Sequence, residues 1–331
     1  MIIVRTPTRV SFCGGGSDLP TFFEKHGGAV VSSGLSRYVY LSIHPSFYPN
    51  ILKCKYSQNE EVTDPGDLKH PIFRVLLEKF GVSGVEITSN ADIPAGTGLG
   101  SSSSFTVALL HLLYAYVGKY VSASRLAEEA CHTEIDLLGE PIGKQDQYAA
   151  AFGGLNFYNF KQDGTVSVEP IIMSKESSKR LENNLLMFYT GSVRSASSIL
   201  AEQKKNVATD LDKEKAQLKI LNYTYELREE LINNNIDAMG DFLHANWEQK
   251  RKLAGGITNP AIDEAYDKAL SAGATGGKLL GAGGGGFLLF YVPEHRHNDV
   301  KNALSNLRYM EFGFAHSGST IIYVGDKPKR Y

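Results

Sequence analysis

The sequence has few cysteines and lacks the spacings that metal or disulfide frameworks need. Its three cysteines, Cys13, Cys54 and Cys131, are an odd number, and no two of them form a Cys-x-x-Cys pair. This pattern excludes a disulfide scaffold or a zinc ribbon and favours a reducing compartment.

The sequence also lacks an excess of charge and a long hydrophobic run. With 34 basic and 36 acidic side chains the net charge is −2, so no nucleic-acid partner is expected. The apolar run at residues 105–117 spans about 13 residues and includes His111, too short to cross a membrane. Residues 1–12 contain Arg5 and alternate like a strand, unlike a signal peptide. We therefore expect a cytoplasmic globular protein without a membrane partner, and we allow for a homodimer.

Several catalytic and nucleotide-binding motifs are missing as well. The sequence contains no G-x-x-x-x-G-K-[ST], H-E-x-x-H or G-x-S-x-G. The stretch "GAGGGG" at residues 281–286 satisfies G-x-G-x-x-G, but it leads into "FLLFYV", a strand pattern. A dinucleotide fingerprint must follow a strand and open a helix, so a Rossmann-type site is excluded.

A glycine- and serine-rich stretch, "DIPAGTGLGSSSSF" at residues 92–105, lies between a strand pattern and a long apolar helix pattern. A flexible linker would not lead straight into a buried helix. Glycines let a ligand approach the backbone, and a helix start offers free N–H groups and the positive end of its dipole, which together suit a phosphate. The alternative is a serine-capped buried helix after a glycine turn.

Two carboxylates are candidates for chemistry. Glu134 falls on the apolar stripe of a helix expected over residues 122–139, and a buried carboxylate needs a cation or a hydrogen-bond donor. A salt bridge and a metal site both satisfy that need. Asp146, in the polar segment "GKQDQ", fits either a catalytic role or a helix cap.

The N-terminal stretch "RTPTRVSFCGGGSDLP" places Arg9 on one face of a strand and Asp18 after three glycines, where backbone can approach a ligand. Taken alone, it also fits a plain strand and turn.

Along the chain, the pattern predicts an α/β or α+β protein of two domains with a boundary near residue 175. Residues 29–45 suggest two short strands around Gly34, residues 70–81 a short helix, and residues 153–171 a hairpin. Beyond the boundary come long helix patterns with charged faces, and strands return around residues 277–292 and 318–325.

Taken together, the three glycine-rich stretches and Asp146 resemble the GHMP kinase superfamily. Its three motifs look like "TPTRVSFCGGGSDLP", "PAGTGLGSSSS" and "KLLGAGGGGFLL", which occur here in order and span essentially the whole chain. The resemblance implies a two-domain α+β fold. Residues 1–175 would form a ribosomal-protein-like N-terminal domain that binds ATP and sugar, and residues 176–331 a helix-rich C-terminal sandwich.

The resemblance also implies roles for the matching positions. Asp146 would act on the acceptor hydroxyl and Arg9 would neutralise charge beside it, while Ser102 and Glu134 would hold Mg²⁺. The acceptor would contact Gly15, Gly16, Ser17 and Asp18. The ATP phosphates and their loop would involve Pro94, Gly96, Thr97, Gly98, Gly100, Ser101, Ser102 and Ser103 from the second motif, with Gly283 and Gly284 from the third.

The "GGGSDLP" form of the first motif resembles the sugar kinases that phosphorylate an anomeric C1 hydroxyl, and it departs from the galactokinase-like Gly-Glu-His-Thr-Asp run. Residues 143–154 and 257–290 resemble the members whose acceptor is D-glycero-D-manno-heptose 7-phosphate. A fucokinase-like acceptor is the alternative, and a sensor that binds sugar and ATP without chemistry is an alternative of another class. Charge alone nominates five residues to clamp a sugar phosphate, each of which also fits a surface position: Arg37, Lys144, Lys250, Arg251 and Lys278.

Overall fold

The computed structural model describes residues 1–191 and 196–325. Within this part of the chain, eight strands form a large sheet in the order β12-β1-β2-β5-β3-β4, with β6 on β2 and β7 on β6. These strands are β1 (Ile2–Cys13), β2 (Gly28–Pro45), β3 (Leu52–Lys55), β4 (Asn59–Val62), β5 (Val85–Ala91), β6 (Leu155–Phe160), β7 (Val166–Pro170) and β12 (Thr320–Val324). Only the β3–β5 pair is parallel among these described strands.

The long strand β2 corrects the prediction of two short strands around Gly34. It runs unbroken through Gly34 because its first half pairs with β6 and its second half with β5, while β1 pairs along both halves. The register with β1 shifts between Pro7 and Thr8, opposite this region, so the irregularity is absorbed as a bulge within the ladder.

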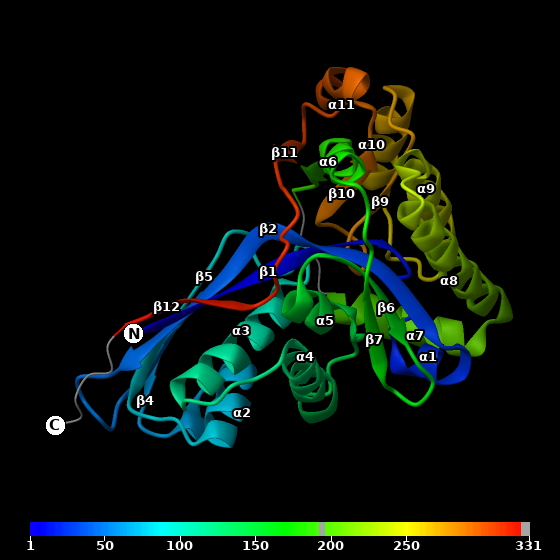
Figure 1. Cartoon of the computed structure of the whole chain (residues 1–331). Helices are drawn as coiled ribbons and strands as arrows, with labels where there is room; N and C mark the ends of the chain where they lie inside the picture. The colour runs from blue at the N-terminus through cyan, green and yellow to red at the C-terminus, as the bar shows by residue number, and fades with distance from the viewer. Residues whose placement is uncertain (192–195, 326–331) are drawn as a thin grey trace.

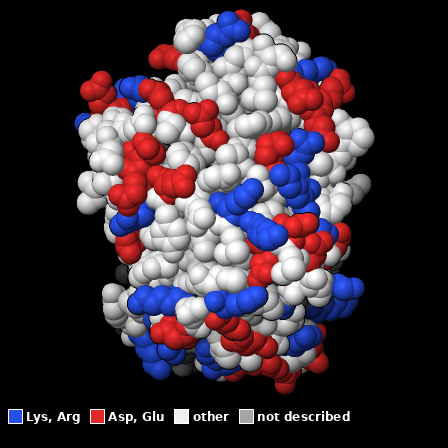
Figure 2. Space-filling view, turned by 90° about the vertical axis from the view of Figure 1, so that its right-hand side faces the viewer, with Lys and Arg blue, Asp and Glu red and all other residues white. Residues whose placement is uncertain are grey.

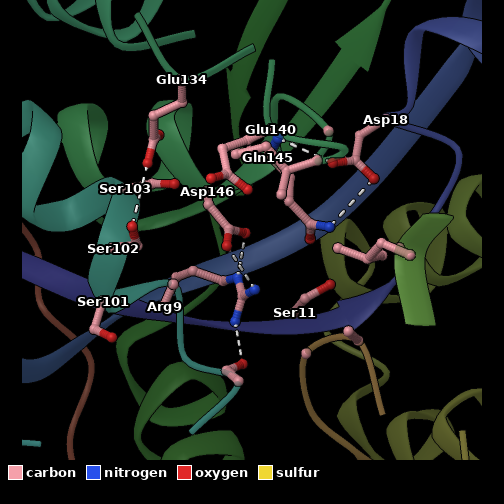
Figure 3. A pocket seen from close by; sticks show the side chains of 18 of the residues that line it. Arg9, Ser11, Asp18, Ser101, Ser102, Ser103, Glu134, Glu140, Gln145 and Asp146 are labelled. Atoms are coloured by element: carbon pink, nitrogen blue, oxygen red, sulfur yellow. Dashed lines mark hydrogen bonds and ion pairs between the residues drawn. The ribbon is translucent and has the colours of Figure 1, made fainter. Parts of the chain in front are cut away.

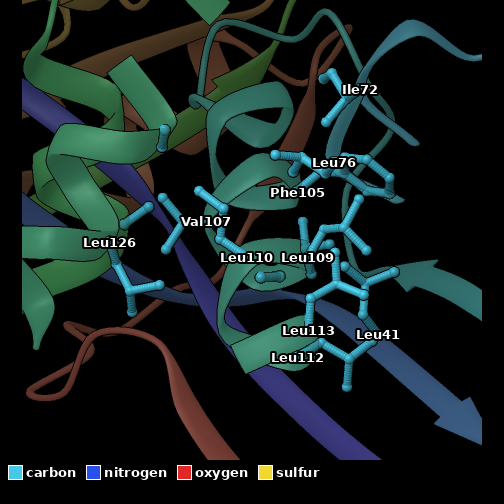
Figure 4. Close-up of a cluster of buried hydrophobic side chains, with 14 of the residues drawn as sticks. Leu41, Ile72, Leu76, Phe105, Val107, Leu109, Leu110, Leu112, Leu113 and Leu126 are labelled. Atoms are coloured by element: carbon cyan, nitrogen blue, oxygen red, sulfur yellow. The ribbon is translucent and has the colours of Figure 1, made fainter. Parts of the chain in front are cut away.

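Helices cover one face of the large sheet, drawn below it in Figure 1. They are α2 (Pro71–Phe80), α3 (Ser101–Tyr116), α4 (Ala123–Cys131), the π-helix η2 (His132–Leu137) and α5 (Gln145–Phe152). The helix predicted over residues 70–81 and the helix predicted after the glycine- and serine-rich stretch are confirmed. Leu109, Leu112 and Leu113 of α3 pack with Leu76 of α2 and Leu41 of β2 in a dry core (Figure 4). The start of α3 lies beside β1, where the Arg9 backbone N–H donates to the Leu99 carbonyl at 3.0 Å.

A second, four-stranded antiparallel sheet has the order β11-β8-β10-β9. Its strands are β8 (Leu185–Tyr189), β9 (Gly276–Leu279), β10 (Phe287–Tyr291) and β11 (Arg308–Met310), and it forms the upper lobe of Figure 1. The helices of this half are α6 (Lys175–Asn183), α7 (Ala196–Thr209), α8 (Leu211–Ile232), α9 (Met239–Lys250), α10 (Pro260–Ser271) and α11 (His297–Ala303). The short helices α1 (Pro20–His26), η1 (Pro65–Asp67), η3 (Ile236–Ala238) and η4 (Glu294–Arg296) complete the described elements.

The predicted domain boundary near residue 175 falls at the start of α6, between the last hairpin of the large sheet and the first strand of the small one. The last strand, β12, returns to the large sheet and pairs with β1. The division into residues 1–175 and 176–331 stays a prediction.

The surface shows both signs of charge. On the face turned to the viewer in Figure 2, basic and acidic side chains are interspersed, which agrees with the net charge of −2. In the described residues, none of the helices combines the length and apolar character needed to span a bilayer.

Candidate active site

A cavity of about 450 Å³ lies where the three glycine-rich stretches meet. Its wall includes Arg9 and Asp18 from the first stretch, Gly98 and Ser102 from the second, and Gly283 from the third. A volume in this range is typical of small-molecule sites. The motifs that are far apart in the sequence are therefore neighbours in space.

The second and third stretches touch each other directly. Gly98 has φ +82°, and a Cβ built on it would lie 2.7 Å from the Leu280 carbonyl oxygen and 3.2 Å from the Gly281 Cα. Glycine is thus needed at Gly98 both for the left-handed backbone and for the close approach. Helix α3 begins after Gly100, so the free N–H groups of its first turn lie beside this contact.

Arg9 and Asp146 form a two-point ion pair at the centre of the cavity (Figure 3). The Arg9 Nε lies 2.8 Å from one Asp146 oxygen, and Nη2 lies 3.0 Å from the other. The remaining Arg9 Nη1 donates to the Gly98 carbonyl at 2.7 Å, which ties the guanidinium to the glycine loop. The Arg9 side chain is 5% exposed and that of Asp146 24%, so the carboxylate faces the cavity with the guanidinium behind it.

Glu134 is buried in the π-helix η2 at the far wall of the cavity. Its carboxylate accepts hydrogen bonds from Gln147 Nε2 at 2.7 Å and from Ser102 Oγ at 3.4 Å. Burial raises the pKa of Glu134 to about 7, against the hydrogen bond from Gln147, which lowers it. A buried carboxylate in this condition lacks a cation, and π-helical turns often occur at functional sites.

These residues fit a magnesium ion that also binds phosphates. In the described chain no group of three or more His, Cys, Asp or Glu side chains forms a metal cluster. Mg²⁺ differs from zinc in this respect, because it usually takes one or two carboxylates together with water and substrate phosphates. The carboxylate of Glu134 with the hydroxyl of Ser102, next to the start of α3, is such a donor set.

Asp18 organises the first glycine-rich loop. It is buried, and it accepts hydrogen bonds from the backbone N–H groups of Gly16 (2.9 Å) and Gln145 (3.1 Å) and from Gln145 Nε2 (3.2 Å). Burial raises its pKa above the usual range, while the bond from the Gln145 backbone acts in the opposite sense. Asp18 thereby links the loop to the N-terminus of α5, one residue from Asp146.

Three buried polar atoms of cavity-lining residues have no hydrogen-bond partner within the described chain: His70 Nδ1, the Ser11 hydroxyl and the Gln145 side-chain carbonyl. The last two are oxygen atoms. Such buried groups are almost always paired in native proteins. The Ser11 hydroxyl can therefore donate to a hydroxyl or phosphate oxygen of a ligand, whereas the Gln145 carbonyl can only accept from a ligand hydroxyl. Sequence reasoning missed both. Ser11 was detectable, because Arg9 and Ser11 are two positions apart and face the same side of β1.

Most of the predicted site residues line the cavity. Those that do are Arg9, Gly15, Gly16, Asp18, Gly96, Gly98, Gly100, Ser101, Ser102, Ser103, Glu134, Asp146 and Gly283. Ser17, Pro94, Thr97 and Gly284 lie outside the lining. The Ser17 hydroxyl has the carbonyls of Gly14 and Ala29 as acceptors within hydrogen-bonding distance, and the Thr97 hydroxyl donates to the Pro94 carbonyl, so both hydroxyls are used inside their loops.

Of the five predicted clamp candidates, the structure brings only Lys250 and Lys278 into the cavity wall. Lys144 donates to the Gly164 carbonyl, and Arg251 pairs with Glu248 and Asp263. Arg37 donates to backbone carbonyls. Charge alone could not distinguish the two lysines of the cavity wall from the other three basic residues, because the difference depends on where α9 and β9 lie in the fold.

Comparison with known proteins agrees with this geometry. Residues 68–154 match the GHMP kinases N terminal domain and residues 227–309 the GHMP kinases C terminal domain, together just over half of the chain. The chain belongs to the GHMP kinase family, and it is an ATP-dependent phosphotransferase of the sugar-kinase type. The predicted two-domain fold and enzyme class are confirmed.

Particular relatives cover nearly the whole chain. A D-glycero-alpha-D-manno-heptose 7-phosphate kinase of Campylobacter jejuni is 27% identical over 331 residues, covering 96% of this chain and 97% of its own. A galactokinase of Pyrococcus furiosus is 25% identical over 340 residues, with 92% of each chain covered. A crystal structure described as a D-glycero-D-manno-heptose 1-phosphate kinase from Bacteroides thetaiotaomicron superposes with a TM-score of 0.81 at 25% identity, covering 98% of this chain and 100% of that one.

Proposed function

We propose that this enzyme transfers the γ-phosphate of ATP to the anomeric C1 hydroxyl of D-glycero-D-manno-heptose 7-phosphate, giving the 1,7-bisphosphate. The observation that supports the chemistry is the Arg9–Asp146 pair, which stands between the glycine loop at Gly98 and the loop held by Asp18. The full-length similarity to the Campylobacter heptose 7-phosphate kinase supports the choice of acceptor.

In this reaction Asp146 accepts the proton of the C1 hydroxyl at a carboxylate oxygen as that hydroxyl attacks the γ-phosphorus, and the bond from this phosphorus to the bridging oxygen breaks, with ADP as the leaving group. Carboxylate oxygens have lone pairs beyond those that Arg9 occupies, so the ion pair leaves an acceptor open toward the cavity. Arg9 offsets the negative charge that gathers between the hydroxyl and the phosphoryl group, in a site where preorganised charges act strongly.

The glycine loop and the first turn of α3 supply backbone N–H groups to the phosphates, from Gly96 through Ser103. Ser102 and Glu134 would hold Mg²⁺, which supplies charge neutralisation on the phosphates of ATP. Asp18 keeps the acceptor loop at Gly15 and Gly16 in place, and the unpaired Gln145 carbonyl offers an acceptor to a sugar hydroxyl.

A second candidate acceptor is L-fucose. The observation in its favour is a 28% identity over 318 residues to a bifunctional fucokinase/GDP-fucose pyrophosphorylase of Arabidopsis thaliana, of which the match covers 30%. The sensor alternative is disfavoured, because Asp146, Arg9 and Glu134 are all present and face one cavity.

The test is a panel of acceptors assayed with purified protein and Mg-ATP: heptose 7-phosphate, heptose, L-fucose, galactose and mannose. We expect the highest kcat/KM with heptose 7-phosphate and a product phosphorylated at C1. A preference of tenfold or more for fucose or galactose, equal to about 1.4 kcal/mol of transition-state discrimination, would refute the proposed acceptor.

A further inference from the structure

Two buried lysines lie on the wall of the cavity that the second half of the chain contributes. Lys250 is in the last turn of α9 and is 7% exposed, and Lys278 is in β9 and is 3% exposed. Both line the same cavity as Arg9 and Asp18. The reaction described above uses neither of them.

The hydrogen bonds of both ammonium groups go to neutral backbone oxygens. Lys278 Nζ donates to the Phe12 carbonyl at 3.0 Å, and Lys250 Nζ donates to the carbonyls of Gly281 and Leu279, the latter at 3.4 Å. None of the ion pairs found among residues 1–191 and 196–325 involves either lysine. Burying a cation without a neighbouring anion is costly, so the two lysines mark a site that is suited to bind an anion.

The pKa values of the two lysines also indicate positive charge that the anions of the described chain do not fully offset. Burial lowers the pKa of Lys278 to about 8, and the positive charge of Arg9 acts in the same direction. The pKa of Lys250 is well below its usual range, first through burial and then through repulsion by Lys278 and Arg9. Asp18 opposes this shift at Lys250, so the lysine lies within electrostatic reach of the acceptor loop.

Strand β1 connects the lysines to the reacting groups. Arg9 and Ser11 face the cavity from alternate positions of β1, and the carbonyl that Lys278 contacts belongs to the next residue, Phe12. Three residues of extended strand from Arg9 to Phe12 correspond to about 10 Å. The Ser11 hydroxyl is buried and without a partner in the described chain, and Ser11 lies beside Arg9 in Figure 3.

We propose that Lys250, Lys278 and the Ser11 hydroxyl form a binding site for a phosphate that the acceptor bears at the end opposite its reacting hydroxyl. This inference rests on the proposed function and identifies the part of the protein that would select a phosphorylated acceptor. A phosphomonoester has a charge of about −1.5 to −2 near neutral pH, which matches two ammonium groups. A neutral sugar hydroxyl would not offset two buried cations, and the transferred phosphoryl group already has Arg9 and the start of α3.

The variants that test the site are Lys250→Met and Lys278→Met, which keep an unbranched apolar stem and remove the charge. Lys268→Met, on the exposed face of α10 where Lys268 pairs with Glu264, is the matched control. Each variant is assayed with acceptors that differ only by a phosphate: heptose and heptose 7-phosphate, and mannose and mannose 6-phosphate.

We expect kcat/KM for the phosphorylated acceptor to fall 10- to 100-fold in both cavity variants. The values for the unphosphorylated acceptor and the KM for ATP should stay within about twofold, as should every value for Lys268→Met. A hydrogen bond to a charged group is worth about 1.5–3 kcal/mol, which corresponds to this range. Thermal unfolding without ligand should show the cavity variants at least as stable as the parent protein, since each loses a buried unpaired charge.

Two outcomes would overturn the inference. If the KM for ATP rises with both acceptors, the lysines bind the nucleotide. If kcat/KM falls equally for the phosphorylated and the unphosphorylated acceptor, the lysines only position the loops. Calorimetric titration with mannose 6-phosphate and with mannose separates this inference from the proposed function. Lysine-dependent binding of the phosphorylated sugar, without turnover of heptose 7-phosphate, upholds the site and rejects the proposed acceptor. Turnover of heptose 7-phosphate that both variants retain does the reverse.

Discussion

Asp146→Asn tests the proposed proton transfer, because it keeps the size of the side chain and removes its ability to accept a proton. In the parent protein both carboxylate oxygens accept from Arg9, at 2.8 and 3.0 Å. An amide at this position can accept only one of the two bonds, since its NH₂ group would face a guanidinium N–H. Arg9 keeps its third contact, to the Gly98 carbonyl, so the guanidinium stays near its place.

The expected loss in kcat is about 10²- to 10⁴-fold, the usual contribution of a general base, or about 3–5 kcal/mol in the barrier. Binding of Mg-ATP should change little, because the groups assigned to the metal, Ser102 and Glu134, lie on other elements. The assay combines steady-state kinetics with calorimetric binding of a non-hydrolysable ATP analogue. Asp299→Asn, which removes a half-exposed carboxylate on α11, is the control.

Retention of kcat within tenfold of the parent value would show that Asp146 is not the proton acceptor. A parallel loss of kcat and of nucleotide affinity would place Asp146 on the metal side of the cavity. Titration with Mg²⁺ adds a further check: if high Mg²⁺ restores kcat in Asp146→Asn and not in Glu134→Gln, the roles of the two carboxylates are reversed.

Three further predictions concern other parts of the cavity. Glu134→Gln should shift the Mg²⁺ dependence of kcat to higher concentration and be partly restored there, and an unchanged Mg²⁺ titration would contradict the metal assignment. Gly15→Ala should fold normally, because a Cβ there meets nothing nearer than 3.8 Å; its methyl group should raise the KM of the acceptor about tenfold or more and leave that of ATP unchanged, in kinetics with either substrate varied. Lys278, which faces Cys13, Arg9 and Lys250, has a pKa of about 8 and binds an anion only when protonated. A pH profile of kcat/KM for heptose 7-phosphate should therefore fall above about pH 8, and that for heptose should not fall there.

Most of the site residues named from the sequence line one cavity, and their roles stay predictions. The residues alone left a structural alternative open for each of Arg9, Asp18, Glu134 and Asp146: a strand and turn, a salt bridge or a helix cap. Their convergence on one cavity could not be derived from spacing, since it depends on how α3 and α5 pack against β1. The resemblance to a family supplied that step.

The features that the sequence did not predict depend on contacts between residues far apart in the chain. The unbroken strand β2 exists because three other strands pair with it, and the local pattern around Gly34 could not reveal them. The helix expected to Gly139 changes to a π-helix after Cys131, where the tertiary setting of Glu134 overrides the simple period. In sequence, Lys250 and Lys278 look like surface lysines. What distinguishes them is that α9 and β9 carry them into the cavity wall.

The return of β12 to the large sheet has a consequence for how the molecule is assembled. Ile2 pairs with Val324, so the outer edge of the first strand stays open until residues 320–324 have left the ribosome and folded back. An open strand edge is a template for pairing with other chains. A nonsense mutation before Thr320 would spare the catalytic cavity and still leave that edge uncovered for the lifetime of the protein. Such a product should be lost to aggregation and proteolysis before any defect in catalysis could be measured. Residues 320–324 would then be essential in the cell for reasons unrelated to sugar phosphorylation.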